Sequence, residues 1–201
     1  MRRHLLSSSL VAAALTGLLG CSADQATAPS PRVSFAPGGV PGTPEAATYA
    51  WHVGDAFGNA VALSSKGNPI ILSLSGTGTL NVFPKAVTGG GEFAFLIFAG
   101  PFPGPGIIGT WTATELLNFQ DYGASPVAGF PPDFRAGKAL MRVHLTALDG
   151  QLQLDGTLRI TSRLPQTEVP GGFEEGVRLA IDDGVNFNRE AGGATLFIVE
   201  P

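Results

Sequence analysis

The stretch MRVHLTALDGQLQLDGTL, residues 141–158, decides the fold because apolar and polar side chains alternate on both sides of a single turn signal. The dipeptide Asp149-Gly150 suits a two-residue type I′ turn, since both of its positions tolerate positive φ. With that turn, the opposing pairs are Met141 with Leu158, Val143 with Gly156, Leu145 with Leu154, Ala147 with Leu152, Arg142 with Thr157, His144 with Asp155, Thr146 with Gln153 and Leu148 with Gln151. Turn and alternation select one register, which predicts an antiparallel hairpin with one buried face.

The same two-residue period runs through residues 70–82, where even positions are apolar or glycine and most odd positions are polar. Gly76 and Gly78 fall on the apolar face of this strand. Glycine there permits a bend or the close approach of another strand, so we expect curvature near Gly76.

A second hairpin is predicted around Asp182-Asp183-Gly184. A two-residue loop would place Leu179 or Ile181 opposite asparagine or glycine. A three-residue loop with Gly184 in the left-handed conformation instead pairs Ile181 with Val185 and Leu179 with Phe187, as in a turn-plus-bulge hairpin.

Two further strands complete the predicted core. Residues 92–98 are apolar on both faces, which predicts a strand covered from both sides. In residues 109–119 one side carries Trp111, Ala113, Leu117 and Phe119, and Glu115 interrupts it. Either a bulge or sheet edge turns Glu115 to solvent, or its carboxylate projects into a cavity. The predicted fold is all-β, an antiparallel β-sandwich or meander barrel of about 8–10 strands in a single domain, residues 49–201.

The N-terminal residues resemble a bacterial lipoprotein signal. Arg2 and Arg3 precede an apolar run, residues 5–19, that is too short to span a bilayer. Leu18-Leu19-Gly20-Cys21 resembles the lipobox, although family members usually carry a smaller residue where Leu19 stands. The resemblance implies a signal peptide over residues 1–20 and acylation of Cys21, the one cysteine of the chain. The alternative is an ordinary signal with Cys21 incidental.

Residues 21–48 are rich in Ala, Pro, Ser and Gly and are expected to form a flexible tether behind the lipidated cysteine. The expected partner is a membrane, reached through several acyl chains on Cys21. Ser22 stands where inner-membrane lipoproteins carry aspartate, which favours the outer membrane of a Gram-negative envelope.

A second resemblance concerns the body of the chain. Gly89-Gly90-Gly91-Glu92-Phe93, GTWTATELLNFQDYG (residues 109–123) and Gly192-Gly193-Ala194-Thr195-Leu196-Phe197 resemble an uncharacterised all-β domain of secreted bacterial proteins. The resemblance supports the all-β architecture and implies no activity, substrate or catalytic residue.

Composition excludes several classes of function. Without residues 1–20 the chain has 10 basic and 16 acidic residues, so it lacks the positive surface that nucleic acid requires. Only His52 and His144 remain, which leaves no multi-histidine zinc site, and no cofactor is expected. Asp182, Asp183, Asn186 and Asn188 offer oxygen ligands for calcium, but hairpin geometry explains them equally well.

Candidate chemistry is sparse. His52 with Asp55 and His144 with Asp155 are possible catalytic pairs, and the second is more simply an exposed cross-strand ion pair. Glu115 and Asp121 are candidate carboxylates, as are Glu174 and Glu175. Among the aromatic residues, Trp111 is expected in the core and Tyr122 at the surface.

Three functions therefore stay open, and a non-catalytic one is favoured. The leading hypothesis is a lipid-anchored envelope domain that acts as a binding or assembly module for an envelope protein. The second is a lipocalin-like barrel for a small apolar ligand, and the third is a hydrolase that uses Glu115 or Asp121. The sequence does not predict an oligomeric state.

Overall fold

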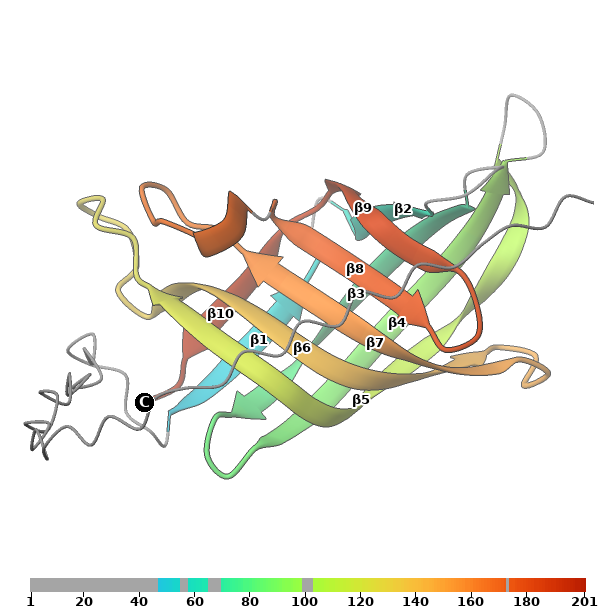
Figure 1. Cartoon of the computed structure of the whole chain (residues 1–201), viewed down its shortest axis with the longest axis horizontal. Helices are drawn as coiled ribbons and strands as arrows, with labels where there is room; N and C mark the ends of the chain where they lie inside the picture. The colour runs from blue at the N-terminus through green and yellow to red at the C-terminus, as the bar shows by residue number, and fades with distance from the viewer. Residues whose placement is uncertain (1–46, 55–57, 65–69, 99–102, 173) are drawn as a thin grey trace, which may run out of the picture. The chain divides into compact units, whose positions relative to one another are not determined.

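The computed structural model describes residues 47–54, 58–64, 70–98, 103–172 and 174–201 (Figure 1). The chain divides into Met1–Gly38 and Gly39–Pro201, and every described residue belongs to the second unit. The predicted signal, Cys21, most of the tether and Asp55 lie outside the described residues. None of the helical segments in the described part of the chain has the length and apolar character needed to cross a membrane.

Ten strands make up the described structure, and all their pairings are antiparallel. They are β1 (Thr48–Val53), β2 (Ala60–Ser64), β3 (Ile70–Asn81), β4 (Ala86–Phe98), β5 (Pro103–Gly123), β6 (Phe134–Ala147), β7 (Gln153–Ser162), β8 (Gly176–Ile181), β9 (Asn186–Gly192) and β10 (Thr195–Val199), with a short 3-10 turn at Pro170–Gly172. The all-β prediction is confirmed.

The strands form one sheet that closes on itself. Four long strands, β3 to β6, pair in sequence order. On its other edge, β3 pairs with β2 through its first half and with β1 through its second half. In the same way, β6 pairs with β10 at its start and with β7 along the rest. Two shorter walls, β7–β8–β9–β2 and β10–β1, therefore connect β6 back to β3 (Figure 1).

The β6–β7 hairpin has the predicted register. Met141 lies opposite Leu158, His144 opposite Asp155 and Leu145 opposite Leu154. The predicted two-residue turn is wrong, because the Gly150 N–H donates to the Ala147 carbonyl and the Ala147 N–H donates to the Leu152 carbonyl, which leaves a four-residue loop. Gly150 is the one residue of this loop with positive φ. The Asp149 carboxylate accepts a hydrogen bond from the Gln151 N–H at 2.9 Å. This local side-chain bond competes with the tighter turn.

The β8–β9 hairpin also has the predicted pairing, with Leu179 opposite Phe187 and the Ile181 N–H donating to the Val185 carbonyl at 3.3 Å. The predicted conformation of Gly184 is wrong, because Asp183 holds the positive φ, at 56°. Gly184 is required for another reason: a Cβ there would lie 2.7 Å from Cγ2 of Ile181.

Two predictions about single strands are settled by burial. The strand over residues 92–98 is not covered from both sides: Phe93 and Phe95 are buried, but Ala94 and Leu96 on the opposite face are only half-buried. No second layer of the described chain covers that face. In β5 the pairing with β6 shifts between Ala113 and Glu115, and this bulge turns Glu115 outward, so that Leu116 becomes the buried residue.

Large side chains fill the interior of the closed sheet. Trp51 and Trp111 stack with ring centroids 5.4 Å apart and an angle of 29° between the planes. Gly76 and Gly78 make room for these rings, because a Cβ would lie 2.8 Å from the Trp111 ring at Gly76 and 2.4 Å from the Trp51 ring at Gly78. The remaining fully buried large residues are Tyr49, Phe187, Phe197, Leu72, Leu74, Leu80, Met141, Leu145, Leu158, Ile160 and Leu179.

Candidate binding site

An apolar hollow of about 230 Å³ opens at one end of the closed sheet. This end is formed by the start of β3, the end of β4, the start of β5 and the β6–β7 and β8–β9 hairpins, whose turns lie to the right in Figure 1. The hollow, which we call the apolar mouth, is lined by Ile70, Phe95, Ile97, Ile107, Leu152, Leu154, Ile181, Gly184, Val185 and Phe187. Among the described residues, those that line the mouth carry neither a charge nor a polar side chain.

The alternation of the strands explains this lining. Each strand points every second side chain inward. At the centre of the sheet these side chains meet and fill the space, but at the strand ends they have fewer partners across the ring. Ile97, Ile107 and Val185 therefore stay 41%, 37% and 40% exposed.

Two exposed apolar side chains lie at the same end of the sheet outside the mouth, in a hollow that Glu92 also lines. Ile108 is 53% exposed and Leu148 is 70% exposed, and the Leu148 N–H donates to the Ile108 carbonyl at 3.0 Å. Five of the six large apolar side chains that are exposed in the described part of the chain lie at this end. Phe83, the sixth, lies at the opposite end of the β3–β4 hairpin. A concentration of exposed apolar groups on one face marks a binding surface more often than scattered ones do.

The rings of Phe95 and Phe187 limit the depth of the mouth. They stack with centroids 5.2 Å apart and an angle of 5° between the planes. Phe187 is buried, and Phe93 packs on the other side of Phe95 at 4.9 Å. An apolar cavity of roughly 150 Å³ is enough to hold benzene, so a hollow of about 230 Å³ has room for one aromatic ring or a short alkyl group.

The candidate carboxylates from the sequence do not line the mouth. Glu115 is exposed on the outer face of β5, opposite Arg142. Asp121 lies toward the other end of β5, where its Oδ2 accepts a 2.9 Å bond from the Tyr49 hydroxyl and its Oδ1 accepts a 2.7 Å bond from the Gly123 N–H. Burial, followed by the nearby Asp121 carboxylate, raises the pKa of Tyr49 well above its usual value. These contacts give Asp121 a structural role.

Tyr122 is half-buried beside Asp121, and its hydroxyl donates to Oε1 of Gln120 at 3.0 Å. Glu175 is also half-buried and accepts a 3.1 Å bond from the Thr195 N–H. Glu174 is exposed. The structure does not bring any two of the candidate acids into contact within the described residues.

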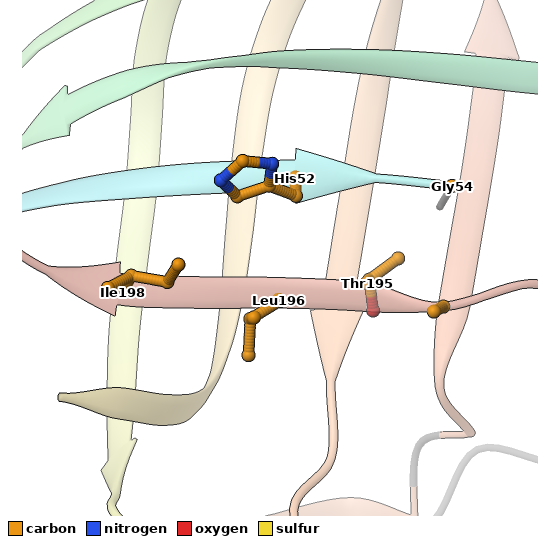
Figure 2. Close-up of a pocket in the computed structure, with 6 residues that line it drawn as sticks. His52, Gly54, Thr195, Leu196 and Ile198 are labelled. Atoms are coloured by element: carbon orange, nitrogen blue, oxygen red, sulfur yellow. The ribbon is translucent and has the colours of Figure 1, made fainter. Parts of the chain in front are cut away.

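The two histidines lie on the outer face of the sheet. His52 lines a mainly apolar groove of about 360 Å³ along β1 and β10 with Gly54, Ala194, Thr195, Leu196 and Ile198 (Figure 2). His144 Nδ1 lies 2.8 Å from Oδ1 of Asp155, and both side chains are exposed, as an ordinary surface pair would be. No nucleophilic side chain contacts either ring in the described part of the chain.

The possible calcium ligands do not converge. Arg142 binds both carboxylate oxygens of Asp182. Asn186 and Asn188 lie along an outer groove together with two arginines, an unfavourable place for a cation. In the described residues, no group of three or more His, Cys, Asp or Glu side chains could hold a metal ion.

Searches of protein-family models, of curated proteins and of solved structures give no match to this chain. The site therefore rests on its geometry. The sequence did not single out the residues of the apolar mouth. Ile97, on the same face of β4 as Phe93 and Phe95, lies near the end of the strand and stays exposed there.

Proposed function

We propose that this chain is a lipid-anchored envelope domain that acts as a non-catalytic binding module and binds a small apolar group in the apolar mouth. The observation that carries the proposal is the mouth itself, a hollow of about 230 Å³ whose described lining residues are all apolar and include the exposed Ile97, Ile107 and Val185. Binding pockets are typically concave and mostly apolar.

The ligand is a molecule that presents one aromatic ring or a short alkyl group. A long acyl chain would have to enter the centre of the sheet, and Trp51, Trp111 and Phe187 already fill that space. The ligand therefore occupies the end of the closed sheet and not its interior, unlike the ligand of a lipocalin-like barrel.

The anchoring half of the proposal rests on the lipobox-like residues 18–21. Several acyl chains on Cys21 would hold the protein stably at a membrane, where a single chain binds only marginally. The domain then needs no membrane-binding surface of its own, which leaves the apolar mouth free for a ligand.

Binding at the mouth is tested with the full-length chain carrying Cys21→Ser and the neutral fluorescent probe N-phenyl-1-naphthylamine. We expect saturable binding that toluene competes away. Ile107→Glu places a charge in the lining and should abolish binding, whereas Phe83→Glu adds the same charge at the opposite end and should leave it unchanged. Equal binding by the two variants, each with an unaltered melting temperature, would refute the mouth as the site.

Anchoring is tested separately in cells. Mass spectrometry of the mature N-terminus should find an acylated Cys21, and Cys21→Ser should move the protein from the membrane to the soluble fraction. An unmodified cysteine in a soluble protein would contradict the anchor without affecting the binding proposal.

A further inference from the structure

The hollow that Glu92 lines has a volume of about 220 Å³ and lies on the outer face of the sheet, where β4 pairs with β5. We call it the Glu92 hollow. Its described lining combines polar and apolar side chains, whereas that of the apolar mouth is apolar alone. The lining residues are Asn59, Glu92, Phe93, Ala94, Ile108, Gly109, Thr110 and Leu148.

The pairing of β4 with β5 brings the central side chains of the hollow together. Glu92 lies opposite Thr110, and Ala94 lies opposite Ile108. Phe93 is buried inside the closed sheet, so its neighbours Glu92 and Ala94 point outward, since side chains alternate along a strand. Their partners on β5 point outward with them, because directly opposed residues share a face.

Two residues from outside these strands complete the lining. Leu148 follows the end of β6, and its N–H donates to the Ile108 carbonyl at 3.0 Å. Asn59 precedes β2, and its Nδ2 donates to Ser73 Oγ at 2.9 Å. Ser73 in turn lies opposite Ala94. Backbone and side-chain bonds therefore hold both residues beside the β4–β5 pair.

The apolar part of the hollow departs from the outward pattern of β5. Thr110 and Thr112, which point outward from the same strand, are polar and exposed. Ile108 is 53% exposed and the neighbouring Leu148 is 70% exposed. Two large apolar side chains that are exposed next to each other offer a surface that a ligand can cover.

The polar part of the hollow offers hydrogen-bond acceptors. In the part of the chain that the structure describes, Glu92 forms no hydrogen bond or ion pair, and no basic side chain lines the hollow. Asn59 donates to Ser73 through its nitrogen, so its Oδ1 stays available to accept. The acids of the outer face that do pair with a basic side chain are Asp155, Asp182 and Glu190.

We propose that the Glu92 hollow binds an organic cation, an ammonium group that carries an apolar substituent. The ammonium group donates to Glu92, Asn59 Oδ1 and the Thr110 hydroxyl, since it has three donors and no acceptor. The substituent covers Ile108 and Leu148. Both parts are needed, because an exposed ion pair alone contributes little to affinity. The excess of acidic over basic residues outside residues 1–20 also attracts a cation.

The test uses the full-length chain with Cys21→Ser, titrated at constant ionic strength with n-butylammonium chloride and, in a second arm, with butan-1-ol. The readouts are the NMR shifts of the Asn59 side-chain amide and of the Ile108 and Leu148 methyl groups. We expect saturable shifts with butylammonium. Butan-1-ol has the same alkyl chain without the charge and should bind about fivefold more weakly.

Two variants separate the two parts of the hollow. Glu92→Gln keeps the size of the side chain and removes its charge, so it should weaken butylammonium binding about fivefold. Leu148→Ala removes apolar surface and should weaken it several-fold. Glu115→Gln is the matched control, because it removes the same charge from the outer face of β5 but outside the hollow. It should leave the affinity unchanged.

Three results would overturn the proposal. The first is a set of shifts that do not saturate or that are confined to Ile107 and Val185, since the butyl group would then bind in the apolar mouth. The second is equal binding of butylammonium and butan-1-ol. The third is an effect of Glu115→Gln as large as that of Glu92→Gln, because the binding would then reflect net charge alone. The two hollows are separate sites, so either one can fail without the other.

Discussion

Trp51 of β1 and Trp111 of β5 stack at the centre of the closed sheet, with 5.4 Å between their ring centroids. β1 and β5 do not pair with each other, but both lie close to β3. β1 pairs with β3 directly, and only β4 separates β3 from β5. Gly76 and Gly78 of β3 leave the space into which the two indoles fit. This stack fills the interior and so leaves the end of the sheet as the place for a ligand.

Gly78→Ala should destabilise the protein by about 3 kcal/mol, since overpacking a close-packed core forces strain. The added Cβ would lie 2.0 Å from the Thr88 carbonyl oxygen and 2.4 Å from the Trp51 ring. Thr77→Ala, at the exposed neighbouring position, is the control and should change stability by less than about 0.5 kcal/mol. Urea unfolding measures both. Equal effects would show that the Trp51 ring does not occupy this space.

The two tryptophans should respond differently to replacement by phenylalanine. Trp111 Nε1 donates to the Ser75 carbonyl at 2.9 Å, whereas Trp51 Nε1 is buried and has no acceptor in the described part of the chain. Trp111→Phe removes a hydrogen bond to the Ser75 carbonyl, but Trp51→Phe removes a donor that has no acceptor in the described part of the chain. We expect Trp111→Phe to cost about 1 kcal/mol more in the free energy of unfolding. A larger cost for Trp51→Phe would contradict the hydrogen bond.

Stability should depend on pH through Glu175. Burial raises the pKa of this carboxyl group above its usual value, although the Thr195 N–H and nearby Arg163 act in the opposite direction. The folded state then holds the proton of Glu175 more tightly than the unfolded state does. The stability that this protonated carboxyl group contributes is therefore fully present below its unfolded pKa and is lost as pH rises through its folded pKa.

Glu175→Gln retains an oxygen that can accept the bond from Thr195 and removes the titration. It should match the parent protein at acidic pH and exceed its stability at neutral pH, by on the order of 0.5 kcal/mol because water screens a half-exposed carboxylate. Thermal melts between pH 4 and pH 8 measure the difference. Glu174→Gln, at the exposed neighbouring position, should show no such trend. A variant that loses stability with rising pH as the parent does would contradict the role of Glu175.

The pairing of residues within the two hairpins could be predicted from the sequence. The β6–β7 register follows from alternation around one turn, and the pairing of Leu179 with Phe187 follows in the same way. The turn conformations could not be predicted, because they depend on details such as the bond from Gln151 to the Asp149 carboxylate and the positive φ of Asp183.

The sequence left a sandwich and a closed barrel both open, and it did not predict the candidate site, for a different reason. Whether β3 pairs with both β1 and β2 on one edge depends on strands that carry no pairing signal in their own residues. The apolar mouth depends in turn on that closure, since Ile70, Ile107 and Val185 come from distant parts of the chain. Glu115 was the opposite case, because the break in alternation at its position raised the prediction of a bulge that the structure contains.

Methyl NMR tests the central claim most directly. With labelled isoleucine, leucine and valine methyl groups in the full-length chain carrying Cys21→Ser, a titration with toluene should give saturable shifts at Ile97, Ile107, Leu154 and Val185. Leu196 and Ile198, in the groove of His52 on the outer face, should not shift. Shifts that are absent from the mouth, or equally large at Leu196 and Ile198, would contradict a binding site at the apolar end of the sheet.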